Sequence, residues 1–318
     1  RLLRMYASEV GYNPNFTIYD TDDQKRIVKS ILKGQNISFN GVKLTERDIV
    51  SIISKIKEKI KTLDEYSVMN KQIVEVYDKY NRALLESNAM DFSDILLNTY
   101  KLLEKPEILE KIQNKYKYIM IDEYQDTNNL QYKIIDLIAR KSSNLCVVGD
   151  ENQSIYGFRG ANILNILNFE NNYNNAKIIK LEENYRSTTT ILDAANELIK
   201  NNKSSKDKKL WTQNGKGDLI KVLACDNGRD EVSRIIEIIK ENHQNGVPYR
   251  DMTILYRTNA QSRIFEEGLL RYNIPHKVFG GISFYSRAEI KDIIAYLSII
   301  VNPQDELNLQ RIINVPKR

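Results

Sequence analysis

Apolar positions in the first ninety residues recur at intervals of three and four, which is the spacing of one helix face. The stretch LTERDIVSIISKIKEKIKTL is the strongest case, because it places five isoleucines on one face: Ile49, Ile52, Ile53, Ile56 and Ile60. Thr45 and Asp48 fit the S/T-x-x-D/E pattern of a helix start. A second helix is predicted from Thr21 to a stop at Gly34, and a third over residues 67–90. Residues 1–87 are therefore predicted to be helical.

From residue 88 the pattern changes to short apolar runs that alternate with helical stretches. YKYIMIDE (116–123) and NLCVVGD (144–150) are predicted strands on either side of a helix over 128–141. Three later runs are also predicted strands: AKIIKLEENYRS (176–187), DLIKVLACD (218–226) and MTILYRTN (252–259). Such alternation predicts an α/β fold with a parallel sheet covered on both faces. Asp122, Glu123 and Asp150 fall at the carboxyl ends of strands, where ligands bind in these sheets.

Composition narrows the class of protein without fixing its function. The chain has 318 residues, of which 42% are hydrophobic and 28% charged, as in a globular protein of two or three domains. No apolar run approaches the ~20 residues of a membrane-spanning helix, so no membrane partner is expected. The chain opens in mid-pattern without an initiator Met, and we expect an internal fragment. Cys146 and Cys225 lie in apolar runs and are predicted to be buried free thiols of a cytoplasmic protein.

The first candidate for chemistry is the acidic pair in DEYQDTN (122–128). Asp122 at a strand end can hold Mg²⁺, and Glu123 beside it can orient and deprotonate an attacking water. A lone Asp-Glu pair is more often a solvated strand end. Gln125 and Asp126 extend the polar cluster and make the stretch more specific.

The second candidate is VVGDENQSIYGFRGAN (147–162). Gln153 has both a donor and an acceptor and suits the sensing of a γ-phosphate or its water. Tyr156, Phe158 and Arg159 suit single-stranded nucleic acid, because bases stack on rings for ~1–3 kcal/mol each while a guanidinium binds phosphate. A glycine-rich turn with its aromatic rings in the core accounts for this stretch equally well. The net charge of +5 permits a nucleic-acid partner but does not require one.

The third candidate is LEENYRSTTTILDAAN (181–196), in which Arg186 precedes a helix with a start signal at Ser187 to Thr190. An arginine that enters a phosphate site from a second domain neutralises charge in the transition state. Tyr185 could stack on a base. The commoner role of a single arginine is to pair with surface carboxylates such as Glu182 and Glu183.

These three stretches, in this order and spacing, resemble the UvrD/Rep family of superfamily 1 DNA helicases. MDFSDIL (90–96), LYRTNAQSR (255–263) and the closing IINVPKR also match family signatures, so the resemblance covers the chain. It implies RecA-like parallel-sheet motor domains of the P-loop NTPase class, incomplete here, with inserted all-helical accessory domains. The implied division is 1–87 as an accessory domain inserted in the first motor domain, 88–183 as the rest of that domain, 184–285 as part of the second motor domain, and 286–318 as the start of a second accessory domain.

The resemblance also implies a role for each matching residue. Asp122 would bind Mg²⁺, Glu123 would be the catalytic base, and Gln153 would couple γ-phosphate sensing to DNA. The remaining implied roles are adenine stacking for Tyr185, an arginine finger for Arg186, contact with single-stranded DNA for Tyr156, Phe158 and Arg159, and a place along the DNA path for Arg257 and Asn259.

The implied cofactors are ATP and Mg²⁺, and the implied activity is 3′ to 5′ translocation with duplex unwinding. The implied partners are single-stranded DNA, single-strand/duplex junctions and repair or replication proteins, in the cytoplasm with the nucleoid. The 318 residues contain no G-x-x-x-x-G-K-[ST] loop, because Lys216 of the one Gly-Lys pair is followed by Gly217. Two alternatives stay open: a paralogue that binds DNA or protein without hydrolysis, and the helicase part of a helicase-nuclease.

Overall fold

The structure is a computed structural model that describes residues 1–34, 37–39, 42–58, 71–173, 175–202, 208–279 and 288–316. The chain divides into two compact units, residues 1–215 with 294–318, and residues 216–293. Over the described ranges, no helix combines the length and apolar character needed to cross a membrane.

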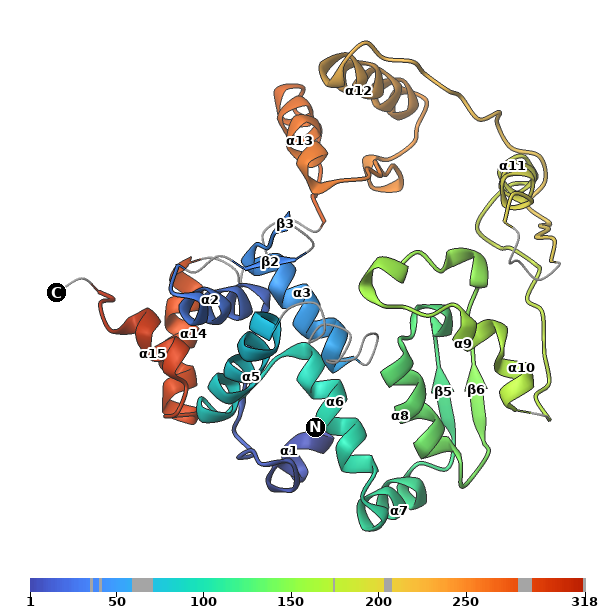
Figure 1. Ribbon diagram of the computed structural model, residues 1–318. Coiled ribbons are helices and arrows are strands. Elements are labelled where there is room, and N and C mark those ends of the chain that lie inside the picture. Colours follow the sequence, from blue (N-terminus) through green and yellow to red (C-terminus); the bar gives the residue numbers. More distant parts are fainter. Residues whose placement is uncertain are drawn as a thin grey trace. The chain divides into compact units, whose positions relative to one another are not determined.

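Three helices of the first unit form its first core. They are α2 (Thr21–Leu32), α3 (Glu46–Lys57) and α5 (Lys71–Glu86) (Figure 1). Their apolar faces bury Val28, Ile53, Tyr80 and Leu84 together, as the periodicity predicts. A short antiparallel pair, β2 (Ser38–Phe39) and β3 (Val42–Lys43), precedes α3.

The starts of these helices test the predicted capping residues. Thr45 and Asp48 form the predicted capping box on α3, with the Asp48 N–H donating to Thr45 Oγ1 at 3.2 Å. The N-cap of α2 is Asp20 and not Thr21, since Asp20 Oδ1 accepts the N–H groups of Asp22 and Asp23. A carboxylate holds two backbone donors, which explains why it displaces the neighbouring hydroxyl. Ile60 and the predicted helical residues 67–70 lie outside the described ranges.

A second core joins the N-terminal turn to the helices that follow residue 91. It is built by α1 (Leu2–Met5), η1 (Ala7–Val10), α6 (Phe92–Leu103) and α7 (Pro106–Lys115), and α8 (Asn129–Ala139) packs against it. Two residues of parallel strand, β1 (Thr17–Ile18) and β4 (Ala89–Met90), tie the chain start to the residues that precede α6. Leu102, Leu103 and Met90 are fully buried at the centre.

The functional end of the first unit rests on the parallel pair β5 (Ile119–Ile121) and β6 (Leu145–Val147). Figure 1 shows the two strands side by side and pointing the same way. Several short elements follow: η2 (Tyr124–Asp126), η3 (Glu151–Gln153), η4 (Gly157–Arg159), α9 (Leu164–Leu167), α10 (Phe169–Asn172) and α11 (Thr189–Ile199).

Three predicted strands do not form in the described chain. Residues 176–187, 218–226 and 252–259 carry no ladder, apart from an isolated bridge between Glu183 and Trp211. A strand persists only when its N–H and C=O groups bond to a neighbouring strand, and no such neighbour lies among the described residues. Val222 and Leu255 accordingly remain exposed, whereas Met252, Ile254 and Tyr256 of the third run are half-buried. The predicted burial of the two thiols is also wrong, because Cys146 is exposed and Cys225 half-exposed, although both are free.

The second unit is organised around α12 (Gly228–Gln244) and α13 (Ser262–Arg271), with single turns η5 (Tyr249–Asp251) and η6 (Asn259–Gln261). The two helices share a core that includes Val232, Ile236 and Phe265. Gly268 permits this contact, since a Cβ there would lie 2.4 Å from Val232 Cγ1.

The last helices are α14 (Ala288–Val301) and α15 (Glu306–Ile312), and the turn between them is bound to the chain start. The Asn302 amide donates to Thr17 Oγ1 and to the carbonyls of Ser87 and Asn88, each at 3.1 Å. Asp305 is fully buried and accepts the Tyr19 hydroxyl at 2.6 Å. Polar groups at this depth persist because each has a partner.

A buried charge cluster joins α3 to α6. The Lys57 ammonium lies 2.7 Å from both Asp91 Oδ2 and Asp94 Oδ2, and Lys57 and Asp91 are each 1% exposed. The Tyr80 hydroxyl donates to Asp91 at 2.9 Å. Two carboxylates share one ammonium here, so the cluster keeps an excess negative charge inside the protein. A charge cluster of this kind fixes geometry more than it adds stability.

Candidate active site

The site is built where β5 and β6 end. The strands are in register from Ile119 with Leu145 to Ile121 with Val147, so their carboxyl ends meet at one edge. Asp122 and Glu123 follow β5 directly, and Asp150 follows β6 after two residues. The predicted placement of these carboxylates at adjacent strand ends is confirmed.

The backbone at Glu123 takes a left-handed conformation, with φ 51° and ψ 40°. This conformation costs a residue with a Cβ about 1–2 kcal/mol. Asp122 compensates in part, because its Oδ1 accepts the Glu123 N–H at 2.9 Å. The turn leads directly into η2. The carboxylate of Asp122 therefore extends from the end of β5, whereas that of Glu123 extends from the start of η2.

Gln125 connects the two strand ends from inside the protein. It is 1% exposed, its Nε2 donates to Glu123 Oε2 at 2.7 Å, and its Oε1 accepts the Asp150 N–H at 3.0 Å. Gly149 makes room for this side chain, since a Cβ there would lie 2.6 Å from Gln125 Oε1. The amide thereby fixes the orientation of the Glu123 carboxylate.

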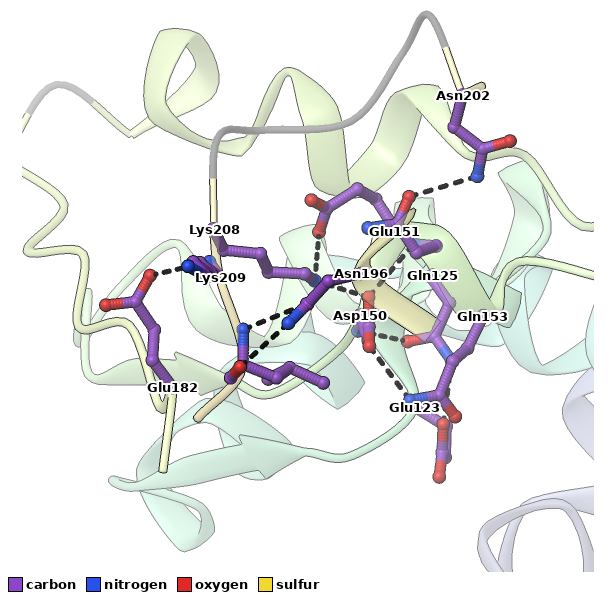
Figure 2. A network of polar contacts seen from close by, with 12 residues as sticks. Glu123, Gln125, Asp150, Glu151, Gln153, Glu182, Asn196, Asn202, Lys208 and Lys209 are labelled. Atoms are coloured by element: carbon purple, nitrogen blue, oxygen red, sulfur yellow. Dashed lines mark hydrogen bonds and ion pairs between the residues drawn. The ribbon is translucent and has the colours of Figure 1, made fainter. Parts of the chain in front are cut away.

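Asp150 is the next member of the same network (Figure 2). Its Oδ2 accepts from Gln153 Nε2 at 2.9 Å, and its Oδ1 accepts the Asn152 N–H at 3.0 Å. The Lys208 ammonium also pairs with Oδ1 of Asp150 and lies 3.3 Å from Glu151 Oε2. Burial acts to raise the pKa of Asp150, but the bonds from Lys208, Gln153 and Asn152 outweigh it and lower that pKa.

The aromatic loop follows this network directly. The rings of Tyr156 and Phe158 lie 6.1 Å apart, and the Arg159 guanidinium lies 5.2 Å and 5.4 Å from them. Phe158 is 74% exposed, so the interpretation with its ring in the core does not hold. The loop presents two rings and a cation to solvent beside the Gln153 turn.

Tyr185 and Arg186 lie on an exposed turn held by Asn184. Asn184 Oδ1 accepts the N–H groups of Arg186 at 3.0 Å and Ser187 at 2.7 Å. The Tyr185 hydroxyl donates to Glu183 Oε2 at 2.9 Å. The following helix starts with Thr188 as its N-cap, one residue after the predicted start. In the described chain, no hydrogen bond or ion pair joins the Arg186 side chain to Glu123.

Arg257 and Asn259 belong to the second unit and are both exposed. Asn259 starts η6, whose capping box pairs Thr258 with Gln261. The structure therefore describes these two residues only within the second unit.

Asp122 fits a magnesium role. Mg²⁺ prefers oxygen ligands and binds through one or two carboxylates together with substrate phosphates and water. Asp122 offers an exposed carboxylate at the strand end. Within the described residues there is no group of three or more His, Cys, Asp and Glu side chains that could hold an ion alone. A single carboxylate that relies on nucleotide oxygens suits this arrangement.

The sequence reasoning missed two residues of the network. Lys208 lies in KNNKSSKDKKLWTQNGKGD, a stretch with the composition of a linker. Its cluster of lysines is the one feature of this stretch that could have indicated pairing with carboxylates. Gly149 carries no chemistry of its own. Its role follows from the close approach of Gln125, which no sequence pattern displays.

Comparison with protein families matches the chain to two models that together cover all but residues 175–178. The UvrD/REP helicase N-terminal domain matches residues 1–174, and the UvrD-like helicase C-terminal domain matches residues 179–318. The first match ends after the aromatic loop, and the second begins before Tyr185 and Arg186.

Curated relatives agree with these matches. The chain is 49% identical over 327 aligned residues to the ATP-dependent DNA helicase PcrA of Staphylococcus aureus, and 47% identical over 324 to that of Staphylococcus epidermidis. All of the chain is covered in both alignments, whereas it spans 44% of the length of each relative.

Proposed function

The chain belongs to the UvrD/REP helicase family, and from this membership we propose that it is part of an ATP-dependent DNA helicase that moves 3′ to 5′ on single-stranded DNA. In this proposal residues 88–183 and 184–285 belong to two RecA-like motor domains. Residues 1–87 and 286–318 belong to helical accessory domains.

One observation carries the proposal: a continuous path of hydrogen bonds runs from Glu123 through Gln125 and Asp150 to Gln153. The path connects the ends of two parallel strands, and Tyr156, Phe158 and Arg159 follow it within six residues. A site that hydrolyses ATP in response to DNA needs such a physical connection between its base and its DNA contacts.

In the proposed mechanism, Glu123 accepts the proton of the attacking water while Gln125 holds its carboxylate in place. Asp122 would hold Mg²⁺, which when bound would neutralise charge on the phosphates. Gln153 turns from Asp150 toward the γ-phosphate and so reports its presence to the aromatic loop.

The exposed turn of Tyr185 and Arg186 supplies the contribution of the second motor domain. Tyr185 stacks on the adenine, and Arg186 stabilises charge on the transferred phosphoryl group. Binding of ATP between the domains closes them, and hydrolysis lets them reopen.

DNA contact is assigned to two surfaces. Tyr156 and Phe158 stack on bases, and Arg159 binds the backbone. Arg257 and Asn259 lie along the path of the strand in the second motor domain. Single-strand/duplex junctions are the proposed substrate, with repair or replication proteins as partners near the nucleoid.

The test is Glu123→Gln in the full-length protein that contains this chain. The change keeps the shape and the hydrogen bond to Gln125 but removes the base, so we expect the rate of DNA-stimulated hydrolysis to fall at least ~100-fold. ATP affinity should stay within about twofold of the wild-type value, because a base acts only on the water. Turnover and nucleotide binding are measured separately, by phosphate release and by equilibrium titration.

Glu107→Gln is the matched control, since Glu107 is an exposed carboxylate in the first turn of α7. It should leave both measurements unchanged. Normal turnover in Glu123→Gln would contradict the assignment of the base. Absence of ATP hydrolysis in the wild-type protein would contradict the proposed function itself.

A further inference from the structure

We propose that Lys208 is a positioning residue that ties the acidic turn at 150–153 to the segment preceding Arg186. The proposal rests on the proposed function, because it assigns a role within the same site. Lys208 touches no reacting atom. It acts through Asp150, whose other oxygen holds the phosphate-sensing Gln153.

The first step is the setting of the ammonium group. Lys208 is 19% exposed, and its Nζ pairs with Oδ1 of Asp150 while lying 3.3 Å from Oε2 of Glu151. The Glu151 side chain is 9% exposed. Two partly desolvated carboxylates thus meet at one ammonium, and removal of that charge breaks both ion pairs.

The second step is that the two carboxylate oxygens of Asp150 bind different partners. Oδ1 accepts from Lys208 and from the Asn152 N–H, while Oδ2 accepts from Gln153. Lys208 therefore fixes the Asp150 carboxylate through Oδ1 and keeps Oδ2 directed at Gln153, which must leave Asp150 to reach a γ-phosphate.

The third step is the anchoring of the segment that carries Lys208. The Lys209 N–H donates to Glu182 Oε1 at 3.2 Å, and the Trp211 N–H donates to the Glu182 carbonyl at 3.0 Å. The Asn184 N–H in turn donates to the Trp211 carbonyl at 2.7 Å. Asn184 is the residue that holds the backbone of Arg186.

The side chain of Asn196 fixes the middle of the same segment. Its amide donates to the Leu210 carbonyl at 2.9 Å and accepts the Leu210 N–H at 3.2 Å. Residues 208–211 therefore connect the first-domain network at one end with the Tyr185–Arg186 turn at the other. A displacement of that turn is transmitted to the Lys208 ammonium, and from there to Asp150.

The competing explanation is a salt bridge that stabilises the fold alone. A stabilising role changes the unfolding free energy and leaves the turnover of folded protein intact. A positioning role lowers kcat at nearly constant KM for ATP and is rescued by a residue that keeps the charge.

The experiment compares Lys208→Met, Lys208→Arg and Lys200→Met in the full-length protein. Met keeps the length and apolar stem of lysine without its charge. Lys200→Met removes an exposed ion pair, with Glu197, on the neighbouring helix α11 and is the matched control. We expect kcat of Lys208→Met to fall about tenfold with KM within about twofold, which is a typical coupling between sites. Lys208→Arg should recover at least half of the wild-type rate, and Lys200→Met should match wild type.

Two further measurements separate the outcomes. In a double-mutant cycle, Lys208→Met should add less than about twofold to the loss caused by Asp150→Asn, because both act through one contact. Amide hydrogen exchange in the 318-residue chain should be faster at residues 150–153 in Lys208→Met than in Lys200→Met, and this readout needs no activity.

The proposal is overturned if Lys208→Met turns over ATP like Lys200→Met, if the cycle is additive, or if exchange at 150–153 is unchanged. An inactive wild-type protein overturns the proposed function instead. In that case the exchange data still decide whether Lys208 holds the turn.

Discussion

At the scale of single residues, the site depends on the missing side chain of Gly149 as much as on its charged groups. Gly149 leaves the volume that Gln125 fills, and Gln125 fixes Glu123. The left-handed turn at Glu123 gives its carboxylate a different local geometry from that of Asp122, the proposed metal ligand.

Gly149→Ala is predicted to disturb this arrangement. The new methyl would lie 2.6 Å from Gln125 Oε1 and 2.8 Å from Ile166 Cδ1, so at least one side chain must move. We expect the free energy of unfolding to fall by ~1–3 kcal/mol, the usual cost of overpacking. Urea denaturation of the 318-residue chain measures it.

Gly157→Ala is the control for that prediction, because a Cβ at Gly157 meets nothing within 4 Å. It should leave the unfolding free energy within about 0.5 kcal/mol of wild type, the usual range for surface changes. Equal stability of the two variants would contradict the packing role of Gly149.

The charged and aromatic site residues could be found from the sequence, because carboxylates, aromatic rings and arginines are the residue types that a phosphate and nucleic-acid site requires. Asp122, Glu123 and Asp150 were predicted at strand ends and lie there. Gly149 and Lys208 could not be found, because one acts through an absent side chain and the other through a contact over 58 residues. The roles of all the candidate site residues, Arg186, Arg257 and Asn259 among them, stay predictions.

At the scale of elements, periodicity predicts helices well and strands less well. The helices predicted over 44–63 and 67–90 form at Glu46–Lys57 and Lys71–Glu86 in the described residues, because an amphipathic helix satisfies its own backbone. The runs at 218–226 and 252–259 remain unpaired, because a strand needs a partner from elsewhere in the chain. The local sequence specifies an apolar run, but it does not specify which other strand pairs with that run.

The contact between α3 and α6 predicts an unusual pH dependence. Burial, together with the charge of Asp91 and against the effect of Lys57, raises the pKa of Asp94 from 3.8 to about 6. The folded state then binds the proton more tightly than the unfolded state does, so stability from this group falls as pH rises from about 4 to about 6. The unfolding free energy of wild type relative to Asp94→Asn should fall over that range, as measured by urea titration at each pH.

Asp48, at the start of α3, supplies a control of opposite sign. Hydrogen bonds from the Thr45 hydroxyl and N–H lower the pKa of Asp48, so its contribution is present above the unfolded pKa and is lost as pH falls. The difference between wild type and Asp48→Asn should therefore grow with pH. Parallel trends in the two series would contradict the assignment at Asp94.

At the scale of the whole chain, we predict that the 318 residues alone do not hydrolyse ATP. Their sequence contains no G-x-x-x-x-G-K-[ST] loop to hold the phosphates, although the proposed base, sensor and arginine finger are present. Phosphate release by purified chain with and without single-stranded DNA tests this. DNA-stimulated turnover that survives Glu123→Gln would indicate a contaminant, whereas turnover abolished by it would refute the prediction.

The hydrogen bond between Tyr19 and Asp305 can form only late in synthesis of the chain. The two residues are 286 positions apart, so at ~5–20 residues per second the ribosome needs roughly 15–60 s to supply the second after the first. Until then the backbone carbonyls of Ser87 and Asn88 lack the amide of Asn302. The nascent N-terminal segment must therefore persist for that time on the two cores formed by its own helices, without the bonds from the turn between α14 and α15.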